Sequence, residues 1–275
     1  MTCQNNRPCP VHIWFAAAGD LNVGFVRRMR WLLSDWEQLR LDSLQAEADK
    51  VRFVAAHALV RVALSKVYPA GIMDWSLDHT FAGKPFVRGP HGAEGLQFSL
   101  SHAGNLVGCA IASVPVGFDI EPLQQDFVVD ELLRGTLAPQ ELSRWHREPR
   151  EDRVRRYLSY WTLKEALAKG LGVGMNVPFS SLAFDVNDDG QAHVLTMPVS
   201  LGDAAAWKVH RLDLMGTYVG AVAVKPKAGE AIELRINRFE MGTLDHWVLS
   251  SRGTAVVRAL QPPDAHLNGR ARWSI

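Results

Sequence analysis

Two long helical segments, each set among short apolar strands, are the feature that most constrains the fold of this chain. Between residues 43 and 66, apolar residues recur at helical spacing, and the segment stops at Tyr68-Pro69. Residues 153–169 form a second helical segment, which ends at Gly170. Each half of the chain thus has one long helix and several strands. This pattern predicts an α+β fold of two lobes with a boundary near Pro115.

The remaining elements are expected to be short. Strands are expected at residues 11–18, 96–100, 106–114, 116–121, 181–186, 192–196, 206–213 and 217–224. Further helices are expected at residues 126–134 and 139–146. The lobes would then comprise residues 1–115 and 116–227, followed by an extension, 228–275, to which the sequence assigns no role. The end of that extension, from residue 261, is expected to be loosely held.

Composition excludes several classes of protein. With 275 residues, 47% of them hydrophobic, the chain can bury a large core. The 30 basic and 29 acidic residues give a net charge of +1, so no overall field favours nucleic acid or an anionic membrane. Three cysteines without paired spacing predict neither a disulfide framework nor a zinc site. Without a long apolar run or a signal-peptide pattern, we expect a cytoplasmic protein.

Two carboxylates stand two residues apart in the expected strand at 116–121. Because residues i and i+2 of a strand point to the same face, Asp119 and Glu121 should face one way while their neighbours face the core. The pair alone favours an ordinary strand with one solvated face. A flanking glycine and proline leave little room for a long solvated strand, so a functional pair stays open.

The second long helix carries a stripe of related residues. Tyr157, Trp161, Glu165 and Lys169 are spaced by four and lie on one face. A Glu–Lys pair at this spacing is commonly a surface pair, but the two aromatic residues favour partial burial. A partly buried carboxylate needs a partner, which a lysine or a cation can supply. Several carboxylates together with phosphate oxygens suit magnesium.

Other polar residues have ordinary structural interpretations when taken singly. His102, between two strands, is typical of a capping residue, and Lys84, in a Gly-Lys-Pro turn, is typical of a solvated lysine. Arg52 and Arg61 are expected to lie along their helix with the guanidinium groups in solvent. The glycines at 170–174 fit a helix C-cap, since they lack the ending of a nucleotide phosphate loop.

The order of the motifs is more informative than any one of them. Along the chain come a helical segment at 52–61, Gly83-Lys84-Pro85, Phe98-Ser99-Leu100-Ser101-His102, Val116-Gly117-Phe118-Asp119-Ile120-Glu121, and Trp161-Thr162-Leu163-Lys164-Glu165-Ala166-Leu167-Ala168-Lys169-Gly170. In this order they resemble the 4′-phosphopantetheinyl transferases, specifically the broad-specificity type that activates surfactin synthetase. The resemblance covers roughly residues 40–225.

The resemblance implies a fold, a reaction and partners. The fold would be two similar α+β lobes related by a pseudo-twofold axis, with coenzyme A between them. The implied enzyme is a monomer that needs Mg²⁺. It moves the 4′-phosphopantetheine arm of coenzyme A to a serine hydroxyl of an apo acyl or peptidyl carrier protein and releases adenosine 3′,5′-bisphosphate. Such carriers serve fatty-acid, polyketide or nonribosomal peptide biosynthesis; no nucleic acid or membrane is involved.

The resemblance also implies roles for residues. Magnesium on the pyrophosphate would be held by Asp119, Glu121 and Glu165. Glu165 would also be the general base, and Lys169 would contact the phosphates as the second catalytic residue. Coenzyme A would be gripped by Arg52, Lys84, Pro85, Ser101, His102 and Lys169. An acid near the metal would be Glu141.

The chain departs from the family pattern in three places. Ala103 stands where a second serine is common, Phe118 is bulkier than the usual residue before the aspartate, and the chain beyond about Gly229 is longer than usual. Six arginines precede the second long helix and form either a basic patch for acidic carrier proteins or a solvated helix face: Arg144, Arg147, Arg150, Arg153, Arg155 and Arg156.

Two other functions stay open. A metal-dependent hydrolase of coenzyme A or of nucleotide pyrophosphates would use the same acids with water in place of serine. A noncatalytic protein that captures carrier proteins or coenzyme A would need none of them. The presence of Asp119, Glu121, Glu165 and Lys169 argues against the noncatalytic alternative.

Overall fold

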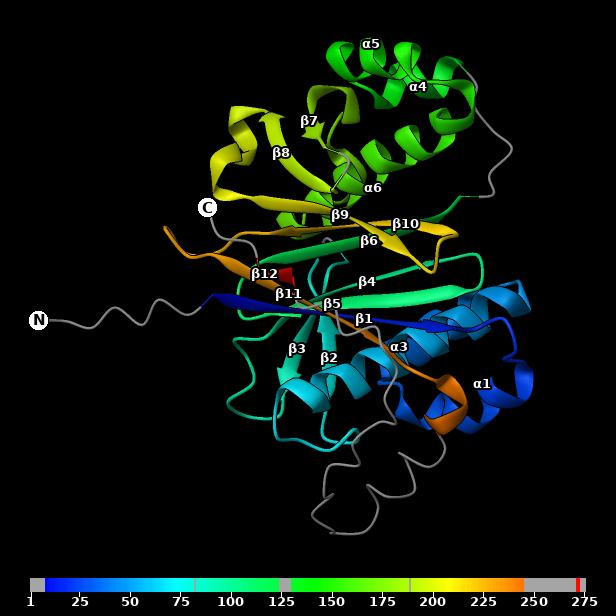
Figure 1. The fold of residues 1–275 in the computed structure, drawn as a ribbon. Coiled ribbons are helices and arrows are strands. Elements are labelled where there is room, and N and C mark those ends of the chain that lie inside the picture. Colours follow the sequence, from blue (N-terminus) through cyan, green and yellow to red (C-terminus); the bar gives the residue numbers. More distant parts are fainter. Residues whose placement is uncertain (1–7, 82, 124–129, 188, 245–270, 273–275) are drawn as a thin grey trace, which may run out of the picture.

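The computed structural model describes residues 8–81, 83–123, 130–187, 189–244 and 271–272. Two five-stranded sheets stack face to face in the middle of the molecule, and one long helix packs on the outer side of each sheet (Figure 1). The result is a four-layer order of helix, sheet, sheet and helix, in which the facing sides of the two sheets are buried against each other.

The first lobe is built from the N-terminal part of the chain. Its elements are β1 (Cys9–Ala17), α1 (Val23–Met29), α2 (Asp35–Ser43), α3 (Glu47–Val67), β2 (Ser76–His79), β3 (Pro85–Gly89), β4 (Gln97–Ala103) and β5 (Leu106–Ala112). Antiparallel pairing joins β1 to β5 and β5 to β4, while β2 and β3 form a separate hairpin. The β2–β3 turn contains the Gly83-Lys84-Pro85 motif.

The second lobe begins with the strand that carries the two carboxylates. Its elements are β6 (Val116–Pro122), α4 (Asp130–Thr136), α5 (Pro139–Arg147), α6 (Arg153–Leu171), β7 (Ala183–Val186), β8 (Gln191–Thr196), β9 (Lys208–Leu214) and β10 (Tyr218–Val224). The strands lie in the order β6-β10-β9-β8-β7 and every neighbouring pair is antiparallel. Short 3-10 turns occur at Arg30–Leu32, Arg150–Asp152, Gly174–Asn176, Phe179–Ser181, Val199–Leu201, Ala204–Ala206 and Met241–Thr243.

The two lobes repeat one plan. Each has a first strand (β1 or β6), a long helix (α3 or α6), a hairpin (β2–β3 or β7–β8) and a final antiparallel pair (β4–β5 or β9–β10). In both, the last strand lies between the first strand and its own hairpin partner. The repeat is structural, and it is invisible as sequence identity because only the apolar pattern has to be kept.

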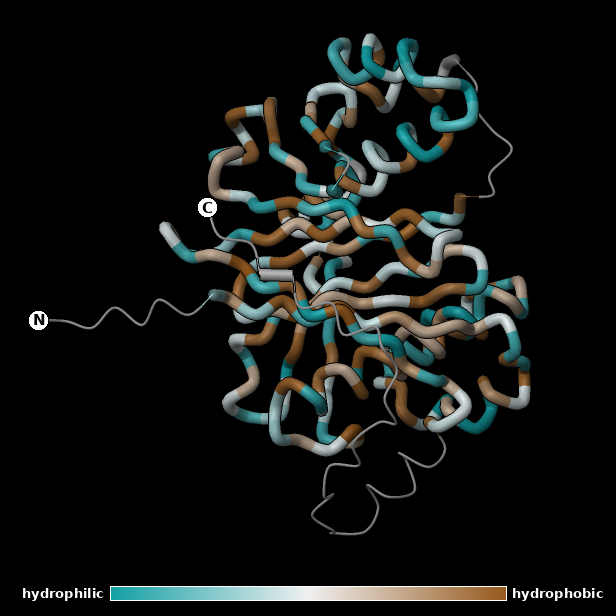
Figure 2. The backbone as a smooth tube through the Cα atoms, viewed as in Figure 1, coloured by the Kyte–Doolittle hydropathy of each residue, from teal (hydrophilic) through white to brown (hydrophobic). Residues whose placement is uncertain are grey.

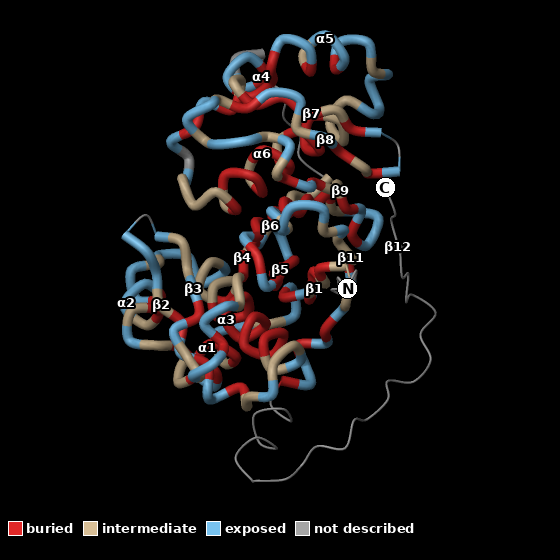
Figure 3. Tube along the Cα trace, turned by 90° about the vertical axis from the view of Figure 1, so that its left-hand side faces the viewer, coloured by how far each residue is buried: buried red, intermediate tan, exposed pale blue. Residues whose placement is uncertain are grey.

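Three buried clusters follow from this layering. One lies between α3 and the first sheet and includes Leu59, and another lies between α6 and the second sheet and includes Leu163. The third lies between the sheets and includes Ile13, Phe118 and Val222. Hydrophobic residues follow the central strands in Figure 2, and buried residues concentrate in the same layers in Figure 3. Each fully buried side chain of this size contributes about 1.5–3 kcal/mol.

Part of the C-terminal extension returns to the first lobe. Strand β11 (Ile232–Arg238) pairs in parallel with β1, and Leu234 joins the cluster between the sheets. The two residues of β12 (Ala271–Arg272) pair with β11. The first sheet therefore has the order β12-β11-β1-β5-β4, and the extension covers the side of β1 that would otherwise be an open edge. Most of the C-terminal end that we expected to be loose lies outside the described residues.

The strands and helices expected from the sequence are present, with ends shifted by a few residues. For the helix expected at 126–134, residues 126–129 lie outside the described part. Elements α1, α2, β2, β3, β11 and β12 were not predicted. Within the described chain, no helix is both long and apolar enough to cross a lipid bilayer.

The expectation that Arg61 keeps its guanidinium in solvent is wrong. Arg61 is buried, and its two terminal nitrogens donate to the Glu37 carboxylate at 2.6 and 3.0 Å. His57 donates to the same carboxylate. Burial alone would raise the pKa of Glu37, but the hydrogen bonds from His57 and Arg61 hold it well below its usual range. This network fixes α2 on α3, which explains why α2 forms despite its weak apolar pattern.

Candidate active site

Helix α6 crosses β6 at two glycines. A Cβ atom at Gly117 would lie 1.9 Å from a backbone oxygen of α6 and 2.3 Å from the amide nitrogen of Gly170, so no larger residue fits there. This close approach brings the carboxylate two residues further along β6, Asp119, to the α6 side chains of Glu165 and Lys169. The glycines therefore determine which polar groups meet.

Strand β4 lies beside β6 and is joined to it by serine hydroxyls. Each strand is an edge strand of its sheet. The hydroxyl oxygen of Ser99 accepts from the amide of Phe118 at 3.0 Å, and that of Ser101 accepts from the amide of Ile120 at 3.3 Å. These bonds satisfy amides on an edge strand that would otherwise lack partners. They also join the two lobes beside the site.

Asp119 is the centre of the polar cluster and is only 4% exposed. Its Oδ1 accepts from the ammonium of Lys169 at 2.6 Å and from the hydroxyl of Ser101 at 2.8 Å. Lys169 also donates to the carbonyl of Leu100 at 3.4 Å. The second oxygen, Oδ2, is buried and has no hydrogen-bond partner among the residues that the structure describes. A buried carboxylate oxygen without a donor is costly, and a bound cation would satisfy it.

Glu165 and Glu121 have different environments. Burial and the negative charge of Asp119 raise the pKa of Glu165, while the positive charge of Lys169 opposes this. Glu121 accepts a hydrogen bond from the indole nitrogen of Trp161 at 3.1 Å. The aromatic residue on the α6 stripe thus contacts Glu121 of β6.

A ready-made metal site is not formed by the residues that the structure describes. No group of three or more histidine, cysteine, aspartate or glutamate side chains there is arranged to hold an ion. Asp119 lies near enough to Glu165 to raise the pKa of that carboxyl, whereas Glu121 accepts a hydrogen bond from Trp161. The donor set still fits a hard cation, because it consists of carboxylate oxygens and includes the unpartnered Oδ2. The assignment of metal ligands stays a prediction.

Lys84 reaches across from the first lobe to the second. Its ammonium donates to the carbonyl of Gly170 at 2.9 Å, in the last turn of α6. Carbonyls in the last turn of a helix have no partner within the helix and attract cations. Burial lowers the pKa of Lys84. Pro85 follows it directly and begins β3. The Gly-Lys-Pro turn therefore lies against the helix that carries Glu165.

The other residues expected to bind coenzyme A lie in two different environments, one around His102 and one inside the protein next to Asp119. Partial desolvation, together with the positive charges of Arg52 and Lys169, lowers the pKa of His102, so Arg52 and Lys169 each lie near this histidine. Arg52 donates to the carbonyl of Gly104 at 3.3 Å. Ser101, by contrast, directs its hydroxyl into the protein toward Asp119.

Glu141, expected to be an acid near the metal, has a structural position instead. It is buried and receives the ammonium of Lys164 at 2.5 Å, so this expectation is wrong. Burial raises the pKa of Glu141 and lowers that of Lys164, and each partner opposes the other's shift. The Lys164 ammonium also donates to the carbonyls of Thr136, Phe179 and Leu182. The Glu141 carboxylate also accepts from the amides of Ala138 and Phe184.

Lys164 is therefore an anchor that sequence reasoning missed. It ties α6 to the segments around α4, α5 and β7. A signal for this was present, since Lys164 shares its helix face with Tyr160 and Leu167, which are both fully buried. A lysine in the middle of an apolar face needs a buried acid, and Glu141 supplies it.

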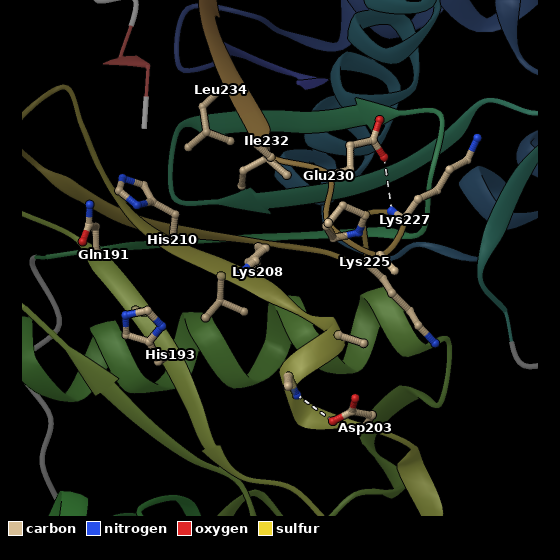
Figure 4. A pocket seen from close by; sticks show the side chains of 18 residues that line it. Gln191, His193, Asp203, Lys208, His210, Lys225, Lys227, Glu230, Ile232 and Leu234 are labelled. Atoms are coloured by element: carbon tan, nitrogen blue, oxygen red, sulfur yellow. Dashed lines mark hydrogen bonds between the residues drawn. The ribbon is translucent and has the colours of Figure 1, made fainter. Parts of the chain in front are cut away.

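Two surface features lie away from the Asp119 cluster. A cavity of about 560 Å³ is bordered by β8, β9, β11 and the segment that joins β10 to β11 (Figure 4). Among the residues that line it are Lys208, His210 and Glu230, and none of the expected site residues is among them.

Of the six clustered arginines, several are paired with acids of the protein itself, as in the pairs Arg144–Asp185, Arg155–Asp213 and Arg156–Glu148. Such pairing favours an ordinary charged surface.

The chain matches a known family over its second lobe. Residues 115–223 match the family model described as the 4′-phosphopantetheinyl transferase superfamily. This range begins just before β6 and ends in β10, so it contains Asp119, Glu165 and Lys169.

Curated relatives extend the similarity to both lobes. The 4′-phosphopantetheinyl transferase HetI of Nostoc sp. is 27% identical over 215 residues, which cover 78% of this chain and 87% of that protein. The transferase psf-1 of Bacillus pumilus is 29% identical over 188 residues, covering 68% and 76%. The transferase Sfp of Bacillus subtilis is 27% identical over 146 residues, covering 53% and 63%. Over residues 115–223 the chain matches the 4′-phosphopantetheinyl transferase superfamily, and over both lobes it is similar to Sfp-type members of that superfamily.

Proposed function

We propose that this enzyme transfers the 4′-phosphopantetheine arm of coenzyme A to a serine hydroxyl of an apo acyl or peptidyl carrier protein, with Mg²⁺ as cofactor. Similarity to this family supports the reaction type. The observation that carries the proposal is the proximity of Asp119 on β6 to Glu165 and Lys169 on α6. Close packing at glycines holds this strand and this helix together. We expect the enzyme to act as a monomer in the cytoplasm.

Asp119, Glu121 and Glu165 are the residues that would hold the cation. The unpartnered Oδ2 of Asp119 and the proximity of Glu165 support this set. Glu121, whose carboxylate accepts a hydrogen bond from the Trp161 indole, would be the third ligand of the cation. When bound, the ion supplies positive charge against the phosphate oxygens of the coenzyme A diphosphate. Lys169 adds a second positive charge, next to Oδ1 of Asp119.

Glu165 is proposed as the general base for the carrier serine. A serine hydroxyl is a weak nucleophile near neutral pH, and a carboxylate with a raised pKa is a better proton acceptor than an ordinary one. The serine oxygen bonds to the phosphorus next to the pantetheine arm, and the bond from that phosphorus to the bridging oxygen breaks. The serine proton goes to Glu165, and adenosine 3′,5′-bisphosphate leaves with the bridging oxygen.

Coenzyme A would be bound by basic side chains around this cluster. Two of them, Arg52 and Lys169, each lie near His102. Lys84 extends from the turn between β2 and β3 to the last turn of α6. Their positive charges suit the phosphates of the coenzyme. Pro85 would support the position of Lys84. Binding of an anion next to His102 would favour its protonated form and so oppose the lowered pKa.

The decisive test is incubation with coenzyme A, Mg²⁺ and a panel of apo carrier proteins, followed by intact-mass measurement of each carrier. We expect the wild-type enzyme to add the mass of phosphopantetheine to a carrier protein. Asp119→Ala and Glu165→Ala should add none, although circular dichroism should show that both variants are folded. Free phosphopantetheine with unmodified carrier would instead identify a hydrolase. Full turnover by either variant would exclude the proposed site.

A further inference from the structure

The Ser-x-Ser pattern of β4 points to a role for Ser101 other than coenzyme A binding. We infer that Ser101 is a positioning residue, which holds Oδ1 of Asp119 so that Oδ2 faces the cation. This inference rests on the proposed function, because it concerns the same carboxylate. It does not follow from the family resemblance, which led us to expect Ser101 among the groups that grip coenzyme A.

The hydrogen-bonding capacity of the Ser101 hydroxyl is already used within the protein. A serine hydroxyl has one hydrogen to donate, and that hydrogen goes to Oδ1 of Asp119 at 2.8 Å. The same oxygen accepts from the amide of Ile120 at 3.3 Å. The residue is only 7% exposed. A phosphate oxygen can only accept a hydrogen bond, so it would have to displace the carboxylate in order to bind this hydroxyl.

The two donors to Asp119 act on the same oxygen. Lys169 and Ser101 both contact Oδ1, which leaves Oδ2 buried and without a partner. A carboxylate can turn about its last side-chain bond, since that torsion is broad. Lys169 sits on a flexible stem, whereas Ser101 is short and lies in a strand. Ser101 is therefore the contact that fixes the plane of the carboxylate.

Ser99 offers a matched control on the same strand. It lies two residues earlier, on the same face, and is buried to a similar extent. Its hydroxyl accepts from the amide of Phe118 at 3.0 Å, as Ser101 accepts from Ile120. Among the described residues, the hydroxyl bond to Asp119 comes from Ser101. Replacing Ser99 by alanine thus removes one bond between β4 and β6, whereas replacing Ser101 removes the equivalent amide bond and also the bond to Asp119.

The experiment measures Mn²⁺ binding to the full-length enzyme with coenzyme A present and carrier protein absent, by titration calorimetry. We expect Ser101→Ala to weaken Mn²⁺ affinity by about 10- to 100-fold, as loss of a residue that orients a metal ligand does. Ser99→Ala should leave the affinity unchanged, although both variants lose an amide bond between the strands and should both lower the thermal midpoint. Ser101→Thr, which keeps the hydroxyl, should restore most of the affinity.

Several results would overturn the inference. Equal Mn²⁺ affinity in Ser101→Ala and Ser99→Ala would make Ser101 a strand contact only. A weaker affinity for coenzyme A with unchanged Mn²⁺ affinity would make it a coenzyme ligand. If Ser101→Ala does not fold, Ser101→Cys, with its weaker donor, replaces it under the same criteria. A wild-type enzyme that binds no Mn²⁺ would contradict the proposed cation site as well as this inference.

Discussion

Glu165 and Lys169 are spaced as an ordinary surface pair on a helix, but their surroundings give them other partners. Lys169 donates to Asp119 of β6 at 2.6 Å, and Glu165 is near enough to Asp119 for the two charges to interact. An exposed pair at i,i+4 would contribute only a few tenths of a kcal/mol to the helix. Here Lys169 instead links α6 to the carboxylate of a strand, and Glu165 lies near that carboxylate.

The raised pKa of Glu165 has a consequence for the pH dependence of catalysis. A general base works only when deprotonated, so kcat/KM should fall as the pH drops through the pKa of Glu165 in the free enzyme. Because burial and Asp119 raise that pKa, the acid limb should lie above the usual value of about 4.3 for a glutamate. Rates of carrier modification measured across pH would locate this limb.

Glu165→Gln provides the control for this prediction. It should lower the rate by about 10²- to 10⁴-fold, the usual contribution of general base catalysis, and it should remove the acid limb. An acid limb at the ordinary glutamate pKa, or a limb that persists in Glu165→Gln, would assign the proton transfer to another group.

The buried Lys164–Glu141 pair should matter for stability. Lys164→Met would leave the Glu141 carboxylate buried without its cation, so we expect the free energy of unfolding to fall by about 3–5 kcal/mol. The matched variant Lys50→Met removes the more exposed pair with Glu47 and should cost about 0–1 kcal/mol. Urea denaturation of both variants measures the difference. Similar losses in the two would mean that the buried pair is not an anchor.

At the scale of elements, the site depends on how closely α6 approaches β6. At Gly117 a Cβ atom would lie within 1.9 Å of a backbone oxygen of α6, and backbone atoms cannot yield as the end of a side chain can. Any shift of α6 carries Glu165 and Lys169 away from Asp119. The strand and the helix are thus each predictable, but the site requires their contact.

Gly117→Ala should therefore reduce transfer strongly and lower stability by a few kcal/mol, since overpacking of this kind costs about 1–3 kcal/mol or more. Gly135→Ala in α4 is the control, because nothing lies within 4 Å of its Cβ position and its backbone is not in the left-handed region. That change should be neutral or stabilising by about 0.5–1 kcal/mol. Thermal unfolding and carrier modification should be measured for both. Full activity in Gly117→Ala would show that the close contact is dispensable.

At the scale of the whole molecule, the extension completes the first lobe rather than leaving it. Strand β11 covers β1 through seven residue pairs, from Cys9–Ile232 to Phe15–Arg238. Leu234 lies in the cluster between the sheets, so it contacts the layer that holds both lobes together. The extension therefore stabilises the arrangement in which β4 and β6 meet.

Leu234→Ala tests this structural role. Emptying a buried leucine position should cost about 2–5 kcal/mol of unfolding free energy. Ile236→Ala, two residues along the same strand, removes a side chain that is 39% exposed and should cost far less. Guanidinium denaturation compares the two. Equal and small losses would mean that β11 adds little to the core.

The sequence predicted the regular elements that are long or apolar, and it missed those that other parts of the chain stabilise. Helix α2 depends on the bonds between Glu37 and Arg61, which are separated by 24 residues. Strand β11 depends on β1, more than 200 residues earlier. Neither has a strong local pattern, because its stabilising partners are distant. The same reason explains Glu141, whose partner Lys164 could be identified only once α5 and α6 were seen to pack.

The sequence by itself determined the resemblance to a family, the long or strongly apolar elements and the identity of the polar residues, because local periodicity and the spacing of motifs are properties of the linear chain. Only the tertiary structure decided which of those residues meet. In the folded protein, Asp119 accepts hydrogen bonds from Lys169 and Ser101. Glu121 accepts one from Trp161, and Glu141 is buried with Lys164. These pairings depend on close packing between a helix and two edge strands that are distant in sequence, and no local pattern records such contacts.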